Sequence, residues 1–271
     1  MNTVQYKGSQ NAGLLDASRG PSQSIWSDCP ILEILNGVVD GVYLFDEFEN
    51  GPRVAAGAEA AYGRYRGFAD TGGLVADGDE VGGTLNLSSD GDNEGASFRT
   101  SCAAFQIKRG LGKFWFEARV KSSTIADTKH GIFVGLMADN ALTAIVPITA
   151  AGAIADVNIV GFHRLEGDGD YFDTIYKADG VTQVTVQADA AVIVADTYVK
   201  LGIVFDPATN VLSFYRNGVK LATSYTVVAA TGTDFPNDVR LGLVMAVLNA
   251  TASTPGSSEI DWWRAAQLLL S

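Results

Sequence analysis

Apolar and polar residues alternate strictly along residues 114–123, FWFEARVKSS. Phe114, Phe116 and Val120 fall on one side of an extended backbone, and the charged residues of the stretch fall on the other. A period of two residues is typical of a β-strand that buries one face. The stretch therefore predicts a strand, and the chemistry of its polar face decides between a catalytic cleft and a structural surface.

Comparable runs, each bounded by turn residues, follow one another from Gly82 to residue 266. They are GGTLNLSS, ASFRTSC, GKFWFEARVKSS, HGIFVGLMAD, VNIVGFHRLEG, YFDTIYKADG, VTQVTVQAD, TYVKLGIVFDPATN, VLSFYRNGVKLAT, DVRLGLVMAVL and SEIDWWRAA. We expect about eleven strands in two packed antiparallel sheets. The residues predicted for the core are Phe114, Phe116, Val134, Ile203, Phe205 and Phe214.

The clearest strand and turn signals occur in residues 200–227. Asp206-Pro207 ends one predicted strand in a turn, and Asn217-Gly218 separates the two strands that follow. Asn and Gly tolerate the positive φ angles of a two-residue hairpin turn. We therefore predict a strand followed by a hairpin that is closed at Asn217-Gly218.

The N-terminal part of the chain lacks this regularity. Residues 1–30 are polar, are interrupted by two prolines, and show neither helical nor strand periodicity. Residues 51–80 are rich in alanine and glycine and predict loop with short strands. We expect an extended N-terminal arm, residues 1–37, followed by one all-β sandwich domain, residues 38–271.

The arm carries Leu14, Leu15, Ile25 and Trp26, which are too few to form a core of their own. Burying a large apolar side chain is worth roughly 1.5–3 kcal/mol. A segment that cannot fold on itself but carries such residues is expected to become ordered on a partner surface. We therefore predict that these four residues dock on a partner.

Composition narrows the fold and the partners. The chain has 271 residues, of which 47% are hydrophobic, and a length of this order suits one all-β domain. The net charge of −12 repels phosphate backbones and anionic lipids, so we expect no nucleic-acid partner. The apolar runs are far shorter than a membrane-spanning helix, and the N-terminus lacks a secretory pattern. We expect no membrane association and synthesis in a cytoplasm.

Cys29 and Cys102 are the only cysteines, and they lack the spacing of a metal or redox pair. We interpret both as reduced structural thiols, and a single bridge between them stays an open alternative.

A glycosidase requires two carboxylates that converge on one bond. Glu259, Ile260 and Asp261 match the first three letters of the E-I-D-x-x-E strand of family 16 glucanases, but the third acid is missing. Alternation places Glu259 and Asp261 exposed on one face, with Ile260 and Trp262 on the other. We interpret this run as a structural strand and expect no catalytic residue.

The segment LEGDGDYFD contains Glu166, Asp168, Asp170 and Asp173, and oxygen-rich loops of this sort can bind calcium. The segment lacks the glycine and the final glutamate of an EF-hand, so a plain acidic hairpin turn is favoured. We predict no metal and no cofactor.

Other polar and aromatic residues have structural interpretations. Glu117 lies beside Arg119 and Lys121 and is expected to form a cross-strand ion pair on a solvated or interface face. His130 and His163 are expected to be satisfied strand histidines. The four tryptophans, Trp26, Trp115, Trp262 and Trp263, could stack on sugars but are more typical of core or interface anchors.

The order of these motifs also supports a resemblance. FWFEARVKSS, GIFVGLMAD, GFHRLEGDGD, TYVKLGIVFD, VLSFYRNGVKLA and SEIDWWRAA, preceded by DGVYLFDEFE, are similar to the concanavalin A-like lectin/glucanase jelly roll of laminin-G type. More narrowly, they resemble capsid-associated virion proteins of tailed phages. The resemblance covers roughly residues 38 to 266, and its motifs specify fold rather than activity.

The resemblance implies a non-enzymatic capsid decoration or cement protein on the outside of a phage head. It implies the major capsid protein as a partner, a homotrimer as the oligomeric state, and synthesis in the host cytoplasm. The alternative, from another functional class, is a lectin-like module that binds a host glycan for adhesion. A decoration protein should bury its arm against other subunits, whereas a lectin should present a free concave face with exposed aromatic residues.

Overall fold

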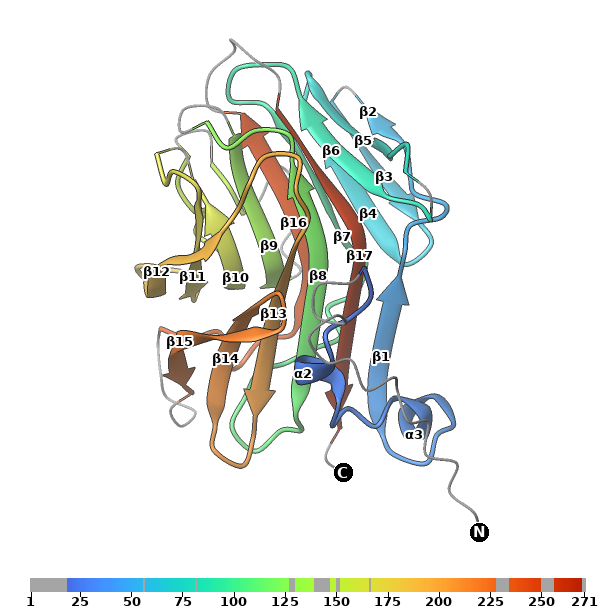
Figure 1. The fold of residues 1–271 in the computed structure, drawn as a ribbon, viewed down its shortest axis with the longest axis vertical. Coiled ribbons are helices and arrows are strands. Elements are labelled where there is room, and N and C mark those ends of the chain that lie inside the picture. Colours follow the sequence, from blue (N-terminus) through green and yellow to red (C-terminus); the bar gives the residue numbers. More distant parts are fainter. Residues whose placement is uncertain are drawn as a thin grey trace.

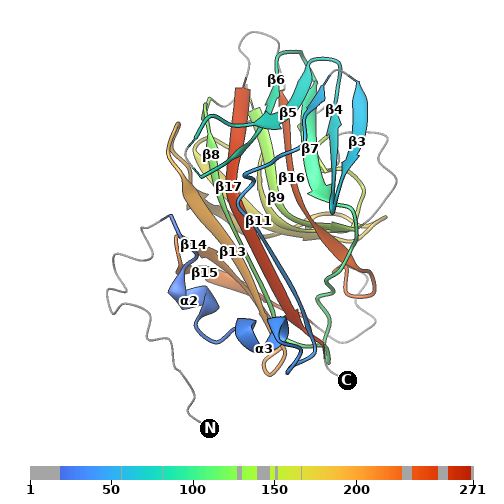
Figure 2. The same ribbon diagram turned by 90° about the vertical axis from the view of Figure 1, so that its right-hand side faces the viewer.

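The computed structural model describes residues 19–55, 57–80, 82–126, 130–138, 147–149, 152–165, 167–227, 234–249 and 256–269. Two antiparallel sheets pack face to face and enclose the core between them, as Figure 1 and Figure 2 show. The predicted two-sheet all-β sandwich is therefore confirmed.

The first sheet, sheet A, has the order β15-β14-β13-β8-β17-β6-β5-β2 in the described part of the chain, and β1 pairs with the C-terminal part of β17. Its strands are β1 (Gly41–Asp46), β2 (Val54–Ala55), β5 (Gly73–Asp77), β6 (Leu85–Ser89), β8 (Phe114–Ser122), β13 (Val199–Asp206), β14 (Val211–Arg216), β15 (Val219–Thr226) and β17 (Gly256–Leu268).

The second sheet, sheet B, has the order β12-β11-β10-β9-β16-β7-β4-β3 over the same described residues. Its strands are β3 (Ala58–Tyr62), β4 (Tyr65–Ala69), β7 (Gly95–Thr100), β9 (His130–Ala138), β10 (Ile159–Arg164), β11 (Tyr171–Lys177), β12 (Val184–Val192) and β16 (Leu241–Asn249).

The core lies where the apolar faces of the two sheets meet. All six residues predicted for it, namely Phe114, Phe116, Val134, Ile203, Phe205 and Phe214, are fully buried in one cluster. Aromatic rings fill the end of this cluster near β4, where the rings of Phe98 and Trp263 stack with centroids 5.3 Å apart. For the strands that carry these six residues, alternation was therefore sufficient to identify the buried face.

The predicted hairpin of β14 and β15 is also confirmed. Asn217 and Gly218 have φ angles of 49° and 78°, and Arg216 pairs directly with Val219. Two consecutive positive φ angles define the type of two-residue turn that matches strand twist.

Residues 51–80 were predicted to be loop with short strands, and four short strands, β2 to β5, lie within residues 54–77. The pattern did not locate these strands or β1, which precedes them. They form because each adds to an edge or neighbour of a sheet whose central strands carry the pattern.

Residues 19–37 differ from the expected extended arm. They contain two short helices, α2 (Gln23–Trp26) and α3 (Ile31–Leu35), which lie against sheet A near the end where β1 begins (Figure 1). Residues 1–18, including Leu14 and Leu15, lie outside the described residues. No helix in the described part of the chain is long and apolar enough to cross a membrane.

Candidate functional site

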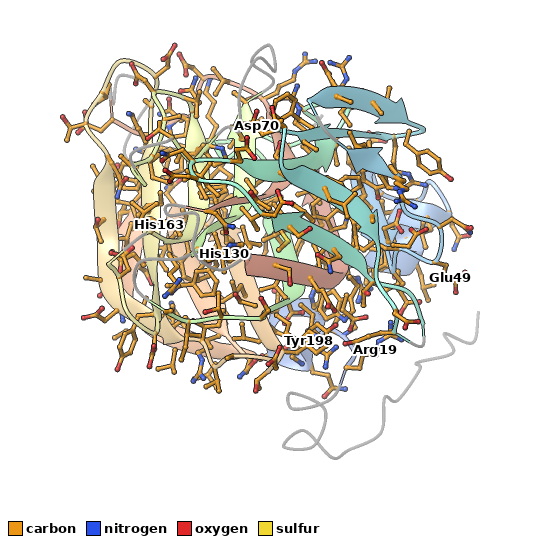
Figure 3. All side chains as sticks on the ribbon, turned by 90° about the horizontal axis from the view of Figure 1, so that it is seen from above. Arg19, Glu49, Asp70, His130, His163 and Tyr198 are labelled. Carbon is orange, nitrogen blue, oxygen red and sulfur yellow. The ribbon has the colours of Figure 1, made fainter. Side chains whose placement is uncertain are left out.

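The outer face of sheet A is the surface that the polar side of residues 114–123 creates. It is formed by β8, β13 and β17, and we call it the charged face. It carries Trp115, Glu117, Arg119, Lys121, Lys200, Glu259, Asp261 and Arg264. The N-terminal residues 19–26 cross it, and Figure 3 shows Arg19 close to Tyr198 at this face.

Glu117 lies at the centre of the charged face and is fully buried. Its Oε2 accepts hydrogen bonds from the backbone N–H of Ser22 and from Nε1 of Trp26, both at 2.9 Å. Burial raises the pKa of Glu117, while these two hydrogen bonds and the nearby Lys200 act in the opposite direction. Glu117 therefore serves as a buried acceptor for the N-terminal segment and not as a member of the predicted cross-strand ion pair on a solvated or interface face.

Asp261 joins the same segment to the sheet from another position. It is 1% exposed, and its carboxylate accepts hydrogen bonds from Nη2 of Arg19 at 2.6 Å and from Arg119. The hydrogen bond with Asp261 raises the pKa of Arg19. One carboxylate is thus held between two guanidinium groups by charge-assisted hydrogen bonds.

Glu259 is held in a second ion-pair network. Lys121 lies between Glu80 and Glu259, with its Nζ 3.1 Å from Glu259 Oε2. The hydroxyl of Tyr198 donates to the same oxygen at 3.1 Å, and the guanidinium of Arg119 stacks on the Tyr198 ring at 3.7 Å from its centroid. Glu259 is therefore also occupied, by the ammonium group of Lys121 and the hydroxyl of Tyr198.

A β-bulge changes the predicted orientation of these acids. The register shifts between Ile260 and Trp262, so that Ile260 and Trp263 face the core while Trp262 does not. Trp262 instead donates from Nε1 to the backbone oxygen of Arg19 at 2.6 Å. The prediction that Asp261 is exposed and that Trp262 shares the face of Ile260 is wrong, because the extra residue of a bulge breaks alternation.

This arrangement has a chemical consequence. A glycosidase needs one carboxyl group that can donate a proton and a second that is free to attack or to activate water. Glu259 is paired with Lys121, Asp261 is paired with two arginines, and Glu117 is covered by the N-terminal segment. The charged face is arranged to bind residues 19–26 and does not present an acid and base pair.

Ile25 and Trp26 are the residues that close this face. They are 2% and 7% exposed and pack with Trp115, Val204 and Ala266 of the chain's own sheet. A Cβ on Gly202 would lie 2.4 Å from Cδ1 of Ile25, so the glycine leaves the space that Ile25 occupies. Both residues were predicted to dock on a partner, and the structure places them against the chain itself because sheet A offers this complementary surface.

Exposed apolar residues occur instead on α3 and just after it. Leu32 and Leu35 are each 61% exposed, and Val38 is 74% exposed. We call these three residues the α3 patch. Sequence reasoning missed it, although the spacing of Leu32 and Leu35 in ILEIL is that of one helix face.

The two histidines have different environments. His130 is fully buried, with Nδ1 2.9 Å from Asn249 Oδ1 and Nε2 2.9 Å from Ser258 Oγ, and burial lowers its pKa to about 4. It is the satisfied strand histidine that was predicted. His163 is 3% exposed, and its Nε2 pairs with the amide of Gln183 at 3.2 Å, but its Nδ1 makes no regular hydrogen bond. The same prediction therefore holds for only one of its two ring nitrogens.

His163 lies next to part of the acidic loop that the sequence singled out. One ligand atom each from His163, Asp168 and Asp173 lie within 4.8 Å of one another. The Nδ1 of His163 is 3.4 Å from Asp168 Oδ2. Asp170 is exposed and outside this group, and Glu166 lies outside the described residues.

The remaining candidates are structural. Cys29 and Cys102 are free thiols, as predicted, and burial raises the pKa of Cys29 to about 12. All four tryptophans are at least 93% buried, as expected for anchors in the core or an interface. Their rings are therefore not accessible for stacking on a sugar.

Comparisons of this chain with known proteins give a result only at the level of structure. No protein-family model matches the chain, and no curated protein matches it in sequence. Among solved structures, the carbohydrate recognition domain of Emp47p superposes with a TM-score of 0.56 and 13% identity, covering 84% of this chain and 95% of that one.

Two enzymes are also similar in structure. The endo-1,3-β-glucanase of Streptomyces sioyaensis gives a TM-score of 0.52 at 11% identity and covers 85% of this chain and 97% of that one. The β-glucanase of Bacillus licheniformis gives 0.50 at 14% identity, with coverage of 82% and 97%. The chain has the concanavalin A-like jelly-roll fold. At these identities the similarity establishes the fold alone, because this fold carries both lectins and hydrolases.

Proposed function

We propose that this chain is a non-enzymatic structural protein of a virion, which binds the outside of a phage capsid as a decoration or cement protein. The observation that carries the non-enzymatic part is the closure of the charged face by residues 19–26. Three carboxylates of this face, Glu117, Glu259 and Asp261, are occupied by donors from the chain itself. The capsid part rests on the resemblance of the strand motifs to tailed-phage virion proteins.

The α3 patch supports binding to a protein partner. A single exposed leucine is common on protein surfaces. Three large apolar residues exposed together within residues 32–38 instead indicate a site of interaction. The group directly follows the anchors Ile25 and Trp26, which fix its position on the sandwich. The partner that this proposal assigns is the major capsid protein or a neighbouring copy in a trimer.

Capsid binding is the direct test. Capsids assembled from the major capsid protein that is encoded with this chain are mixed with the purified chain, and binding is measured by co-sedimentation and by a density map. We expect density for the sandwich on the outer surface. The variant Leu32→Ser/Leu35→Ser should bind at least about tenfold more weakly, as expected for residues that contribute most of an interface energy.

A matched control separates the α3 patch from general loss of surface hydrophobicity. Val194→Ser/Val219→Ser removes two apolar side chains that are 50% and 68% exposed on other strands and loops. This control should bind like the wild type. A chain that stays in the supernatant with intact capsids contradicts the proposal.

Two N-terminal deletions test different parts of the proposal, because residues 19–26 cover the charged face whereas residues 1–18 carry Leu14 and Leu15. Deleting residues 1–30 removes Arg19, Ser22 and Trp26 and uncovers the charged face. Deleting residues 1–18 keeps these contacts and removes Leu14 and Leu15. If the predicted docking of Leu14 and Leu15 is correct, this shorter deletion weakens capsid attachment while the free energy of unfolding stays within about 0.5 kcal/mol.

Hydrolysis is tested separately. The native chain should release no sugar from a β-glucan, and the double variant Glu259→Gln/Asp261→Asn should not differ from it. Hydrolysis by the native chain that is abolished in the double variant would overturn the non-enzymatic assignment.

The second candidate function is glycan binding, and a hollow beside β1 favours it. The hollow has a volume of about 410 Å³ and is lined by Phe45, Asp46, Glu47, Glu49 and Asn50. Carboxylates next to an aromatic ring are groups that can hold sugar hydroxyls and a sugar ring face. One similar structure is named a carbohydrate recognition domain, which is consistent with this use of the fold.

A glycan array followed by calorimetry tests this candidate. If a glycan binds in the hollow, Glu49→Ala should abolish binding, whereas Glu59→Ala, at an exposed acid on β3, should not. Capsid binding without any glycan binding leaves the decoration protein as the function.

A further inference from the structure

The hairpin of β10 and β11 brings three metal-binding side chains together. His163 of β10 is directly opposite Asp173 of β11 in the antiparallel register, and Asp168 lies in the turn between the two strands. Both strand residues lie on the outer face of sheet B, because their neighbours Phe162 and Phe172 face the core. The site is therefore separate from the charged face of sheet A, as the labels of His163 and Tyr198 in Figure 3 show.

We propose that His163, Asp168 and Asp173 bind a divalent transition-metal ion, with Zn²⁺ as its representative. One imidazole nitrogen and two carboxylate oxygens are a donor set that suits ions of this class. An all-oxygen set would instead favour Ca²⁺ or Mg²⁺.

The distance between His163 and Asp168 supports this assignment. Their Nδ1 and Oδ2 atoms are 3.4 Å apart, longer than the usual 2.7–3.2 Å of an N–H···O hydrogen bond. Two ligands bound about 2.0–2.1 Å from a tetrahedral Zn²⁺ are about 3.3–3.4 Å apart. The pair is therefore spaced as two ligands of one ion.

The environment of His163 provides an independent indication. The side chain is 97% buried, as its exposure of 3% requires, and its Nδ1 has no hydrogen-bond partner. A buried polar atom without a partner costs roughly 1–3 kcal/mol. The neighbouring Asp168 Oδ2, at 3.4 Å, makes no regular hydrogen bond with this nitrogen, and a metal ion between the two groups gives both of them a direct partner.

Gln183 can hold the imidazole in the tautomer that metal binding requires. Its amide nitrogen lies 3.2 Å from Nε2 of His163 and donates to it in this structure. When the amide turns over, its oxygen accepts the Nε2 proton instead and leaves the Nδ1 lone pair directed toward Asp168, as metal binding requires.

The carboxylates are each fixed by one backbone contact. Asp168 Oδ2 accepts the N–H of Leu165 at 2.7 Å, and Asp173 Oδ1 accepts the N–H of Asp189 at 2.8 Å. The second oxygen, Oδ2 of Asp173, is 3.9 Å from Nε2 of His163. The ligand atoms lie within 4.8 Å of one another, so binding of the ion requires the Asp173 side chain to turn until one oxygen reaches it, and water completes the coordination.

Calorimetric titration of the full chain with ZnCl₂, after removal of metal with a chelator, tests the site. We expect one ion per chain, and the Co²⁺ derivative should show the visible absorption of a four-coordinate ion. His163→Gln, Asp168→Asn and Asp173→Asn should each weaken Zn²⁺ binding at least about tenfold, since even contacts behind the direct ligands cost 10–100-fold.

The control is Asp170→Asn, which removes the same charge from an exposed residue of the same turn. It should bind Zn²⁺ within about twofold of the wild type. Equal losses in Asp170→Asn and Asp168→Asn would mean that Zn²⁺ is attracted only by the acidic turn, and would overturn the proposal. So would tighter binding of Ca²⁺ than of Zn²⁺, or no uptake of Zn²⁺ and Co²⁺ by the wild type.

Folding of the variants is measured without metal, by circular dichroism and thermal unfolding. A variant that is folded but whose midpoint no longer rises on addition of ZnCl₂ supports the site. If His163→Gln does not fold, the two aspartate variants give the answer, and a Zn²⁺-dependent rise that both retain would contradict the proposal.

Discussion

The two short helices of the N-terminal segment, α2 and α3, have similar lengths and similar apolar residues but opposite environments. On α2, Ile25 and Trp26 are buried against sheet A. On α3, Leu32 and Leu35 are each 61% exposed. A helix of four or five residues has no stability of its own in water, so the surface beneath it decides which side chains are buried.

The surface under α2 is specific in shape and in charge. Gly202 leaves room for Ile25, and Glu117 accepts the indole N–H of Trp26 at 2.9 Å. The guanidinium of Arg264 lies 4.4 Å from the centroid of the Trp26 ring. Under α3, Ile34 contacts the backbone near Gly41 while the two leucines face away from this contact. We infer that α2 anchors the N-terminal segment to sheet A and that α3 exposes the α3 patch to solvent.

The largest expected effect is that of removing the main anchor. Trp26→Ala removes a buried indole, its hydrogen bond to Glu117 and its contact with Arg264, so the free energy of unfolding should fall by about 3–5 kcal/mol. Urea denaturation measures this loss, and hydrogen exchange should show that the amide of Ser22 loses its protection.

Tyr62→Ala, at a 47% exposed aromatic residue of β3, is the control and should change stability by less than about 0.5 kcal/mol. A loss below 1 kcal/mol for Trp26→Ala would mean that α2 contributes little to the fold, and the contrast with α3 would disappear.

A smaller effect is expected from filling the space under α2. In Gly202→Ala the new Cβ would lie 2.4 Å from Cδ1 of Ile25, and the isoleucine must shift. We expect a loss of about 1–2 kcal/mol in urea denaturation, within the range of overpacked sites.

The matched control is Gly131→Ala in β9, where the nearest atom is 3.5 Å from the added Cβ. The two variants make the same chemical change in strands of the same sandwich. An equal loss in both would show that the cost arises from glycine in a strand and not from the fit of α2.

These predictions also indicate what the sequence could and could not provide. Alternation is a local property, so the strands of residues 82–266 and the buried positions of Phe116 or Ile203 follow from it. The bulge at Asp261 is not visible in the pattern, because one extra residue inverts the face of every residue after it. The docking of α2 depends on Gly202 and Glu117, which are remote in sequence and are unremarkable until the strands are paired.

The cluster of His163, Asp168 and Asp173 could have been predicted from the sequence in part. Residues 163 and 173 are equally distant from Asp168, the centre of the turn, so the hairpin alone predicts that the histidine faces Asp173. The four acids of the loop suggested calcium, and His163 alone suggested a structural strand histidine. Pairing the residues across the turn would have joined them.

A pH titration tests the buried acceptor under α2. Because burial raises the pKa of Glu117, the protonated form of this carboxyl favours the folded chain. Its contribution to stability is therefore largest at low pH and is lost as the pH rises from about 4.3, the usual glutamate value, through the raised value. Glu117→Gln does not titrate and can still accept from Ser22 and Trp26.

The free energy of unfolding of Glu117→Gln relative to the wild type should rise with pH across this window and then level off. Urea denaturation at a series of pH values measures it, and Glu59→Gln on exposed β3 gives the background. A relative stability of the amide variant that falls as the pH rises would show that Glu117 is stabilised as a carboxylate, and the account of α2 as a cover over a costly buried charge would be wrong.

The smallest effect on stability is expected on α3. Leu32→Ser/Leu35→Ser changes two side chains that are already 61% exposed, so the free energy of unfolding should stay within about 0.5 kcal/mol of the wild type.

Self-association of the chain should instead be weakened by the same double variant. If the α3 patch contacts a neighbouring copy, light scattering on a size-exclusion column should show a trimer for the wild type and a smaller species for this variant, because the lost contacts belong to the interface and not to the fold. A double variant that is destabilised by more than 1 kcal/mol while its mass stays unchanged would place α3 with α2, as a second anchor of the sandwich.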